Sequence, residues 1–342
     1  MKLRAWGLFL FAVLHTAFPG SLATSQSTTS SAPTSPQSGG DGVKLNVDLV
    51  VLDAQVVQRK TARIVGNLKR EDFLLREDGA LQQITQFGQD TLPLSVILLV
   101  DRGGCLDPFS DKVRQATLDA IYRLKRTDEV ALMAFADTAD LIKGFRFDRG
   151  MIADALNRLP PHDENAGHCF NRAFYEAAKF MREAGNPAGR RVIIMITGIT
   201  KSFDCNPGPS SEETRNEVLE AGAVVCGLVP ITPEQRLENG VIGGAATVAG
   251  IFKAHTSSLG QLAEETGGEI FSAKPADLDA AFSNLIDHLR NRYTIGFVSS
   301  NTKRDGTYRK VKLEVSPAIQ KREGEVVVKT RRGYKAAKAA KT

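Results

Sequence analysis

The residues best able to do chemistry in this sequence are three cysteines, Cys105, Cys169 and Cys205. His168 directly precedes Cys169, and Asp204 directly precedes Cys205. Thiolates and imidazoles bind zinc, a thiolate activated by an imidazole is a nucleophile, and two thiols in an oxidising compartment form a disulfide. The sequence therefore offers a metal site, a thiol enzyme or a covalent cross-link.

The motifs that accompany enzymes are missing from the chain. Cys169, His168 and Asp163 could supply a nucleophile, a base and a carboxylate, but no sequence signal for an oxyanion hole accompanies them. The sequence has no C-x₂-C pair, GxSxG, HExxH or P-loop, and no GxGxxG after a strand. We therefore expect a protein that is not an enzyme and uses no cofactor. A zinc or redox-active thiol site remains the alternative, with the ligands Cys105, His168, Cys169 and Cys205.

The segments that must position these residues alternate between strands and helices. Residues 94–100 (LSVILLV) and 192–196 (VIIMI) are uninterrupted apolar runs, which is typical of buried parallel strands. Ser110 and Asp148 are placed to cap two of the helices. Further strands are expected at 130–135, 141–145, 223–229 and 269–272, and helices at 110–126, 148–159, 170–184, 211–221, 257–266 and 275–291. This order predicts an α/β fold with a doubly wound, mostly parallel sheet.

Two β-rich flanks enclose this α/β segment. Short β-type runs occur within residues 45–87 and again within residues 293–330. Because neither flank has enough strands for a stable sheet, we expect them to pair with each other. The prediction is a small, discontinuous β-sandwich-like domain from residues 43–93 and 292–335, with the α/β domain of residues 94–291 inserted in it. Residues 336–342 are expected to form a frayed basic tail.

The N-terminus has the pattern of an export signal. Residues 1–23 combine a basic start, an apolar run of about 14 residues and the small-residue site Ser21-Leu22-Ala23. A bilayer-spanning helix needs about 20 apolar residues, so an uncleaved anchor is the alternative. Residues 24–42 are rich in Ser, Thr, Pro and Gly and predict a flexible linker. We expect a secreted or periplasmic protein, where disulfides form.

The net charge of +5 is unevenly distributed. Residues 290–342 hold 15 Lys/Arg against 4 Asp/Glu, whereas residues 24–289 carry a net charge of −8. An acidic, exported body argues against nucleic-acid binding. The basic residues of the closing strands are expected to be solvated strand faces that protect sheet edges. The alternative is docking on an anionic surface, such as lipid headgroups or a cell-wall polymer.

At the level of whole motifs, the chain resembles a von Willebrand factor type A domain. The resemblance lies in the apolar strand ending at Asp101, followed in order by TDEVALMAFAD (127–137), RRVIIMITG (190–198) and TGGEIF (266–271). The flanking segments LNVDLVVLDAQVV (45–57), LKREDFLLREDG (68–79) and RRGY (331–334) are similar to those of the exported VWFA-related proteins common in Acidobacteria.

The resemblance implies a Mg²⁺ adhesion site whose ligands are mostly replaced here. Such a site uses Asp-x-Ser-x-Ser after the first strand, a later Thr and a later Asp. In this chain the first motif reads DRGGC from Asp101, the Thr position falls at His168 or Cys169, and the later Asp becomes Thr197. Mg²⁺ requires several oxygen ligands, and one carboxylate does not supply them. We expect a degenerate site without metal.

By the same resemblance, the function is recognition of an extracytoplasmic protein partner. Type A domains bind through loops at the carboxyl edge of the sheet, because a rigid sheet positions those loops. In this chain the expected binding face includes Asp101, Arg102, Asp163, His168 and Asp204.

The cysteines at this edge are candidates for a disulfide. Cys105 and Cys169 replace residues that would approach one metal ion, so their Cα atoms could lie within about 7 Å. Cys205 is the third candidate, and unpaired buried thiols remain the alternative. A disulfide here would hold together loops that a metal ion otherwise joins.

Overall fold

A computed structural model describes residues 49–89, 92–159, 162, 166–186, 189–199, 205, 207–231 and 258–339. The predicted signal (1–23) and linker (24–42) lie outside these residues, as do Asp163 and Asp204. Among the described helices, none is long and apolar enough to cross a membrane.

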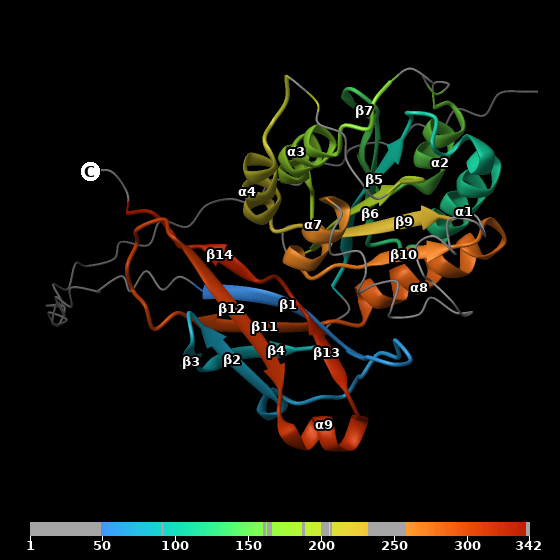
Figure 1. Cartoon of the computed structure of the whole chain (residues 1–342). Helices are drawn as coiled ribbons and strands as arrows, with labels where there is room; N and C mark the ends of the chain where they lie inside the picture. The colour runs from blue at the N-terminus through green and yellow to red at the C-terminus, as the bar shows by residue number, and fades with distance from the viewer. Residues whose placement is uncertain are drawn as a thin grey trace, which may run out of the picture. The chain divides into compact units, whose positions relative to one another are not determined.

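The central sheet has six strands in the order β10-β9-β8-β5-β6-β7. Figure 1 labels β5, β6, β7, β9 and β10 of this sheet. All neighbours are parallel except β7, which runs antiparallel to β6 at one edge. The strands are β5 (Leu94–Asp101), β6 (Glu129–Phe135), β7 (Ala139–Arg146), β8 (Arg190–Ile196), β9 (Val224–Pro230) and β10 (Ile270–Ala273). Every residue of β5 is buried, as the uninterrupted apolar run predicts.

Helices cover both faces of this sheet and form two apolar cores. Leu98 of β5 belongs to the core with α1, α2 and α8, whereas its neighbour Leu99 belongs to the core with α3, α4 and α7. The helices are α1 (Ser110–Arg123), α2 (Arg149–Asn157), α3 (Phe170–Phe180), α4 (Ser211–Ala221), α7 (Ser258–Thr266) and α8 (Leu278–Arg290). The α/β, doubly wound fold is thus confirmed.

The two predicted helix caps have different outcomes. Asp148 caps α2, because its carboxylate accepts a hydrogen bond from the Gly150 amide at 2.8 Å. The prediction for Ser110 was wrong. A 3-10 turn over Asp107–Phe109 leads directly into α1, so Ser110 is already helical and Phe109 occupies the cap position.

The flanks pair with each other in two antiparallel sheets, ordered β13-β1-β11-β4 and β14-β12-β2-β3. Their strands are β1 (Leu49–Gln58), β2 (Phe73–Glu77), β3 (Ala80–Gln82), β4 (Ile84–Gly88), β11 (Tyr293–Val298), β12 (Tyr308–Val315), β13 (Val326–Lys329) and β14 (Gly333–Lys335). A third apolar core lies between these strands. Helix α9 (Pro317–Glu323), which follows β12, was not predicted.

Two expectations for the basic C-terminal part need correction. The tail is not frayed over its described length, because Lys338 forms a β-bridge with Asp305 and the Ala339 amide donates to the Arg304 carbonyl. Arg309 and Lys329 are not solvated either. Arg309 is buried beside Glu77, and the Lys329 ammonium lies 2.8 Å from the buried carboxylate of Glu269.

Candidate functional site

The carboxyl end of β5 holds a buried carboxylate that accepts several hydrogen bonds. The Asp101 side chain is 0% exposed. Its Oδ1 accepts from the Gly103 amide at 2.9 Å, and its Oδ2 accepts from the Thr197 hydroxyl at 2.6 Å and from the Cys105 thiol at 3.3 Å. The loops after β5 and β8 therefore converge on Asp101.

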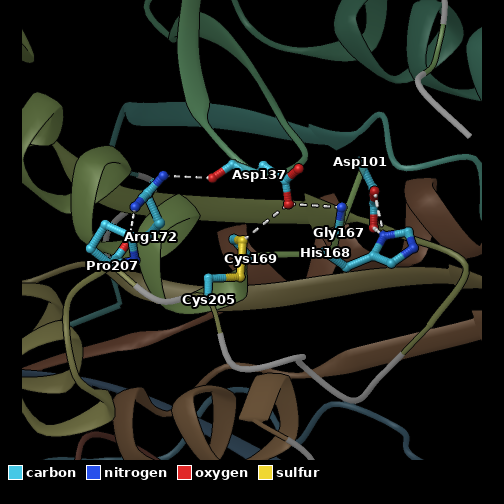
Figure 2. The surroundings of a disulfide bond; sticks show 8 residues. All are labelled: Asp101, Asp137, Gly167, His168, Cys169, Arg172, Cys205 and Pro207. Carbon is cyan, nitrogen blue, oxygen red and sulfur yellow. Dashed lines mark hydrogen bonds and ion pairs between the residues drawn. A yellow bond between two sulfur atoms is a disulfide. The ribbon is translucent and has the colours of Figure 1, made fainter. Parts of the chain in front are cut away.

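The His168 imidazole lies next to this carboxylate. Its Nδ1 lies 2.9 Å from both oxygens of Asp101, and the side chain is only 12% exposed (Figure 2). The hydrogen bond to Asp101 raises the pKa of His168 above its usual value. Burial alone would lower this pKa, whereas the negative charge of Asp137 also raises it. The ring nitrogen thus faces both oxygens of one carboxylate, as a bound cation would.

Glycine at position 103 is a requirement of this arrangement. A Cβ atom added to Gly103 would lie 2.6 Å from Cε1 and 2.7 Å from Nδ1 of His168. Real Cβ atoms essentially never make contacts this short. The imidazole therefore occupies the space that a side chain at position 103 would need.

Cys105 is an unpaired thiol that belongs to the same cluster. Its sulfur accepts a hydrogen bond from the Gly198 amide at 3.1 Å. Burial, followed by the nearby charge of Asp101, raises the pKa of Cys105 to about 12, so it is a neutral thiol at pH 7. Ligand-type atoms of Asp101, Cys105 and His168 lie within 4.8 Å of one another.

The disulfide joins Cys169 to Cys205, with their Cα atoms 5.5 Å apart (Figure 2). A disulfide among the three candidate cysteines is confirmed, but the expected approach of Cys105 to Cys169 does not produce the bond. Cys105 directs its sulfur toward Asp101 and the Gly198 amide instead. The fourth cysteine, Cys226, is an unpaired residue buried in β9.

Two further residues, not identified from the sequence, fix the loops around the disulfide. Asp137 follows β6, and its Oδ1 accepts from the Gly167 amide at 2.8 Å. Arg172 of α3 donates to the Asp137 carbonyl at 2.8 Å and also to the Pro207 carbonyl (Figure 2). The only sequence signal for Asp137 is its place as the first acidic residue after an apolar strand.

Of the five residues predicted for the binding face, three are described. Asp101 and His168 are in contact. Arg102 follows Asp101, and its side chain lines a hollow of about 170 Å³ beside Asp107 and Asp111. The positions of Asp163 and Asp204 lie outside the described residues.

Comparisons with known proteins found one matching family model and several similar structures. Residues 96–200 match the family model for the von Willebrand factor type A domain. The chain is similar to the structure of an aerotolerance-related membrane protein from Bacteroides fragilis, with 15% identity over 57% of this chain and 98% of that chain and a TM-score of 0.41. It is also similar to BatB from Bacteroides thetaiotaomicron, with 15% identity over 57% of this chain and 99% of that chain and a TM-score of 0.40. A third similar structure is the vWF domain of the type V pili tip protein Mfa5 from Porphyromonas gingivalis, with 12% identity over 58% of this chain and 95% of that chain and a TM-score of 0.39.

No curated protein sequence matches the chain. The matched segment begins in β5 and extends just past β8, so it contains the Asp101 loop, His168 and Thr197. These residues thus lie in the segment that matches the von Willebrand factor type A model, and this segment stands between the two β-rich flanks.

Proposed function

We propose that this chain is an exported, non-enzymatic binding module. It recognises an extracytoplasmic protein partner through the loops at the carboxyl edge of the type A sheet, and a metal ion does not mediate the contact. The observation that carries the proposal is the His168–Asp101 pair, in which the imidazole nitrogen lies 2.9 Å from the carboxylate. This is the position in which we expect the side chain to replace a metal ion.

The donor set around Asp101 does not fit Mg²⁺. This ion takes oxygen ligands in near-octahedral geometry and keeps several waters. Among the described residues, Asp101 is the only carboxylate in the cluster of Asp101, Cys105 and His168. Its oxygens already accept hydrogen bonds from Gly103, Thr197, Cys105 and His168. A divalent cation would have to displace these donors and would repel a protonated imidazole.

The loops at this edge are fixed in ways that suit protein recognition. The Cys169–Cys205 disulfide and the two hydrogen bonds of Arg172 connect the start of α3 with the loops after β6 and β8. A binding surface that is already ordered loses less conformational entropy when the partner docks. The chemistry of the cysteines supports a non-enzymatic role, because Cys169 is cross-linked and Cys105 is a buried neutral thiol.

A soft-metal site is the second candidate, favoured by the short mutual distances among Asp101, Cys105 and His168. Two of the four ligands expected for a thiol site, Cys169 and Cys205, are joined in the disulfide. Zinc binding would therefore depend on the remaining three residues and would require the Cys105 thiol to lose its proton.

Metal titration with a matched variant tests the metal-independent part of the proposal. We expect neither Mg²⁺ nor Zn²⁺ to change the melting temperature of the protein. The variant Gly103→Ser, Cys105→Ser, His168→Thr, Thr197→Asp restores oxygen ligands, and its melting temperature should rise with Mg²⁺ concentration. A Zn²⁺-dependent rise in the native protein would favour the soft-metal site, and a Mg²⁺-dependent rise would refute the proposal.

Site-specific cross-linking tests partner recognition. A photo-reactive amino acid at Arg102 should give a discrete adduct with an extracytoplasmic protein, and excess unmodified protein should compete for that adduct. The control places the same group at exposed Lys60 in the β-rich flank, where no such adduct is expected. Equal adducts from both positions would contradict recognition by the carboxyl-edge loops.

A further inference from the structure

A cleft of about 720 Å³ lies away from the Asp101 cluster, where the closing β strands meet the α/β domain. Strands β12 and β13 form one side, and the end of α7 with the turn after it forms the other. Apolar side chains line much of the cleft, among them Ala263, Ile270, Val327 and Val328.

Strand β13 presents an unpaired edge. It is the first strand of its sheet and pairs only with β1 among the described strands. The Arg59 amide donates to the Glu325 carbonyl, so Glu325 directs its backbone groups toward β1. In an antiparallel pair every second residue does so. The backbone groups of Val327 therefore point toward β1, and those of Val328 point away from it. Val328 lines the cleft, and no strand among the described residues pairs with this outer edge of β13.

Part of one edge of β12 in the same cleft also has no partner strand among the residues that the structure describes. The Val311 amide donates to the Arg332 carbonyl, on the side where β14 pairs with residues 308–310. By the same alternation, the backbone groups of Leu313 point to this side, beyond the end of β14. The side-chain oxygen of Thr330, also in the cleft wall, is buried without a hydrogen-bond partner among the described residues.

The charged residues of the cleft leave an excess of positive charge. Seven Lys/Arg side chains and three carboxylates line it. Each carboxylate has a cationic partner within the lining: Glu264 with Arg332, Glu265 with Arg215 and Glu269 with Lys329. Arg76, Lys310 and Arg331 line the same cleft and form no ion pair with a described residue.

We propose that this cleft binds an extended peptide with alternating acidic and apolar side chains, which adds as a strand to the free edge of β13. Strand addition uses main-chain hydrogen bonds for affinity and side-chain contacts for specificity. The backbone groups of Val328 would pair with the peptide, and the cations Lys310 and Arg331 would meet its carboxylates. None of these residues belongs to the Asp101 cluster, so this proposal stands independently of the proposed function.

Fluorescence anisotropy with the full chain tests the proposal. The probe is a short, fluorescein-labelled peptide of alternating Glu and Val. We expect saturable binding that weakens as salt is added, because the charges involved are partly exposed. A Lys/Val peptide and a Glu/Val peptide interrupted by prolines serve as control probes, since the first reverses the charge and the second cannot pair as a strand.

A charge-reversing variant assigns the binding to the cleft. Lys310→Glu should raise the dissociation constant at least about ten-fold, and the exposed position of Lys310 predicts an unchanged melting temperature. Lys112→Glu, on the exposed face of α1, is the matched control and should bind the peptide as the native protein does. The proposal is overturned if the Glu/Val peptide does not bind or if either control peptide binds as tightly. Equal weakening by the two variants would also overturn it.

Discussion

Replacing His168 by alanine should destabilise the protein because it removes the cation beside a fully buried carboxylate. Breaking a buried ion pair by removing one partner typically costs about 3–5 kcal/mol. Asp101 would keep its hydrogen bonds from Gly103, Thr197 and Cys105, which compensate part of the lost interaction. We therefore expect a loss near the lower limit, about 3 kcal/mol in the free energy of unfolding at pH 6.

A double-mutant cycle in urea separates the pair from other effects of the substitution. The four proteins are the native chain, His168→Ala, Asp101→Asn and the double variant. Asparagine keeps the shape of Asp101 without its charge, so His168→Ala should cost much less in that background. We expect a coupling energy of about 2 kcal/mol.

The coupling should depend on pH in a direction set by the raised pKa of His168. Stability from a raised histidine pKa is fully present below the unfolded value of about 6.5 and is lost as pH rises through the higher folded value. The cycle should therefore give a larger coupling at pH 6 than at about pH 9.5. A coupling below about 0.5 kcal/mol, or one that is the same at both pH values, would refute the assignment of His168 as the built-in cation.

Three further changes probe the same domain. Reduction of Cys169–Cys205, which lie 36 residues apart, should lower the free energy of unfolding by up to about 4 kcal/mol; a reductant should have no effect on the Cys169→Ser/Cys205→Ser variant in urea unfolding. Although burial alone would raise the pKa of Glu269, hydrogen bonding from His288 and nearby positive charge lower it to about 2. The contribution of Glu269 to the free energy of unfolding should thus be present above about pH 4.5 and be lost as pH falls toward 2. In the Glu269→Gln variant the free energy of unfolding should change less with pH over this range. Gly103→Ala should cost about 1–3 kcal/mol by crowding the imidazole beside it, and an equal cost after His168→Ala would contradict that reason.

The parts of the fold that depend on local pattern could be predicted from the sequence. The apolar run at the start of the α/β segment forms β5, and the helix expected at 211–221 begins and ends as α4 does. The cap by Ser110 failed because a 3-10 turn before the helix moves its start, and this turn has no distinct apolar period. Helix α9 has only 7 residues, too few for a clear helical pattern.

Pairing between distant residues could not be predicted in the same way. The sequence placed the cysteines at one edge of the sheet, but which sulfurs meet depends on side-chain direction, and Cys105 turns toward Asp101. The burial of Lys329 has a similar cause. Its partner Glu269 is far away in the sequence, and a basic residue in a strand gives no sign of the carboxylate that the folded chain brings next to it.

The residues at the positions where the resemblance expects metal ligands contact one another in the structure, although they are far apart in the sequence. His168 can face Asp101 only because position 103 has no side chain. The Thr197 hydroxyl donates a hydrogen bond to the Asp101 carboxylate. A carboxylate at position 197 would instead repel Asp101, and one imidazolium could not neutralise both charges. We therefore expect that a side chain at position 103 alone, or a carboxylate at position 197 alone, destabilises the cluster. Mg²⁺ binding should appear only when positions 103, 105, 168 and 197 are changed together. If one change alone were enough for Mg²⁺ binding, the four residues would not act as a unit.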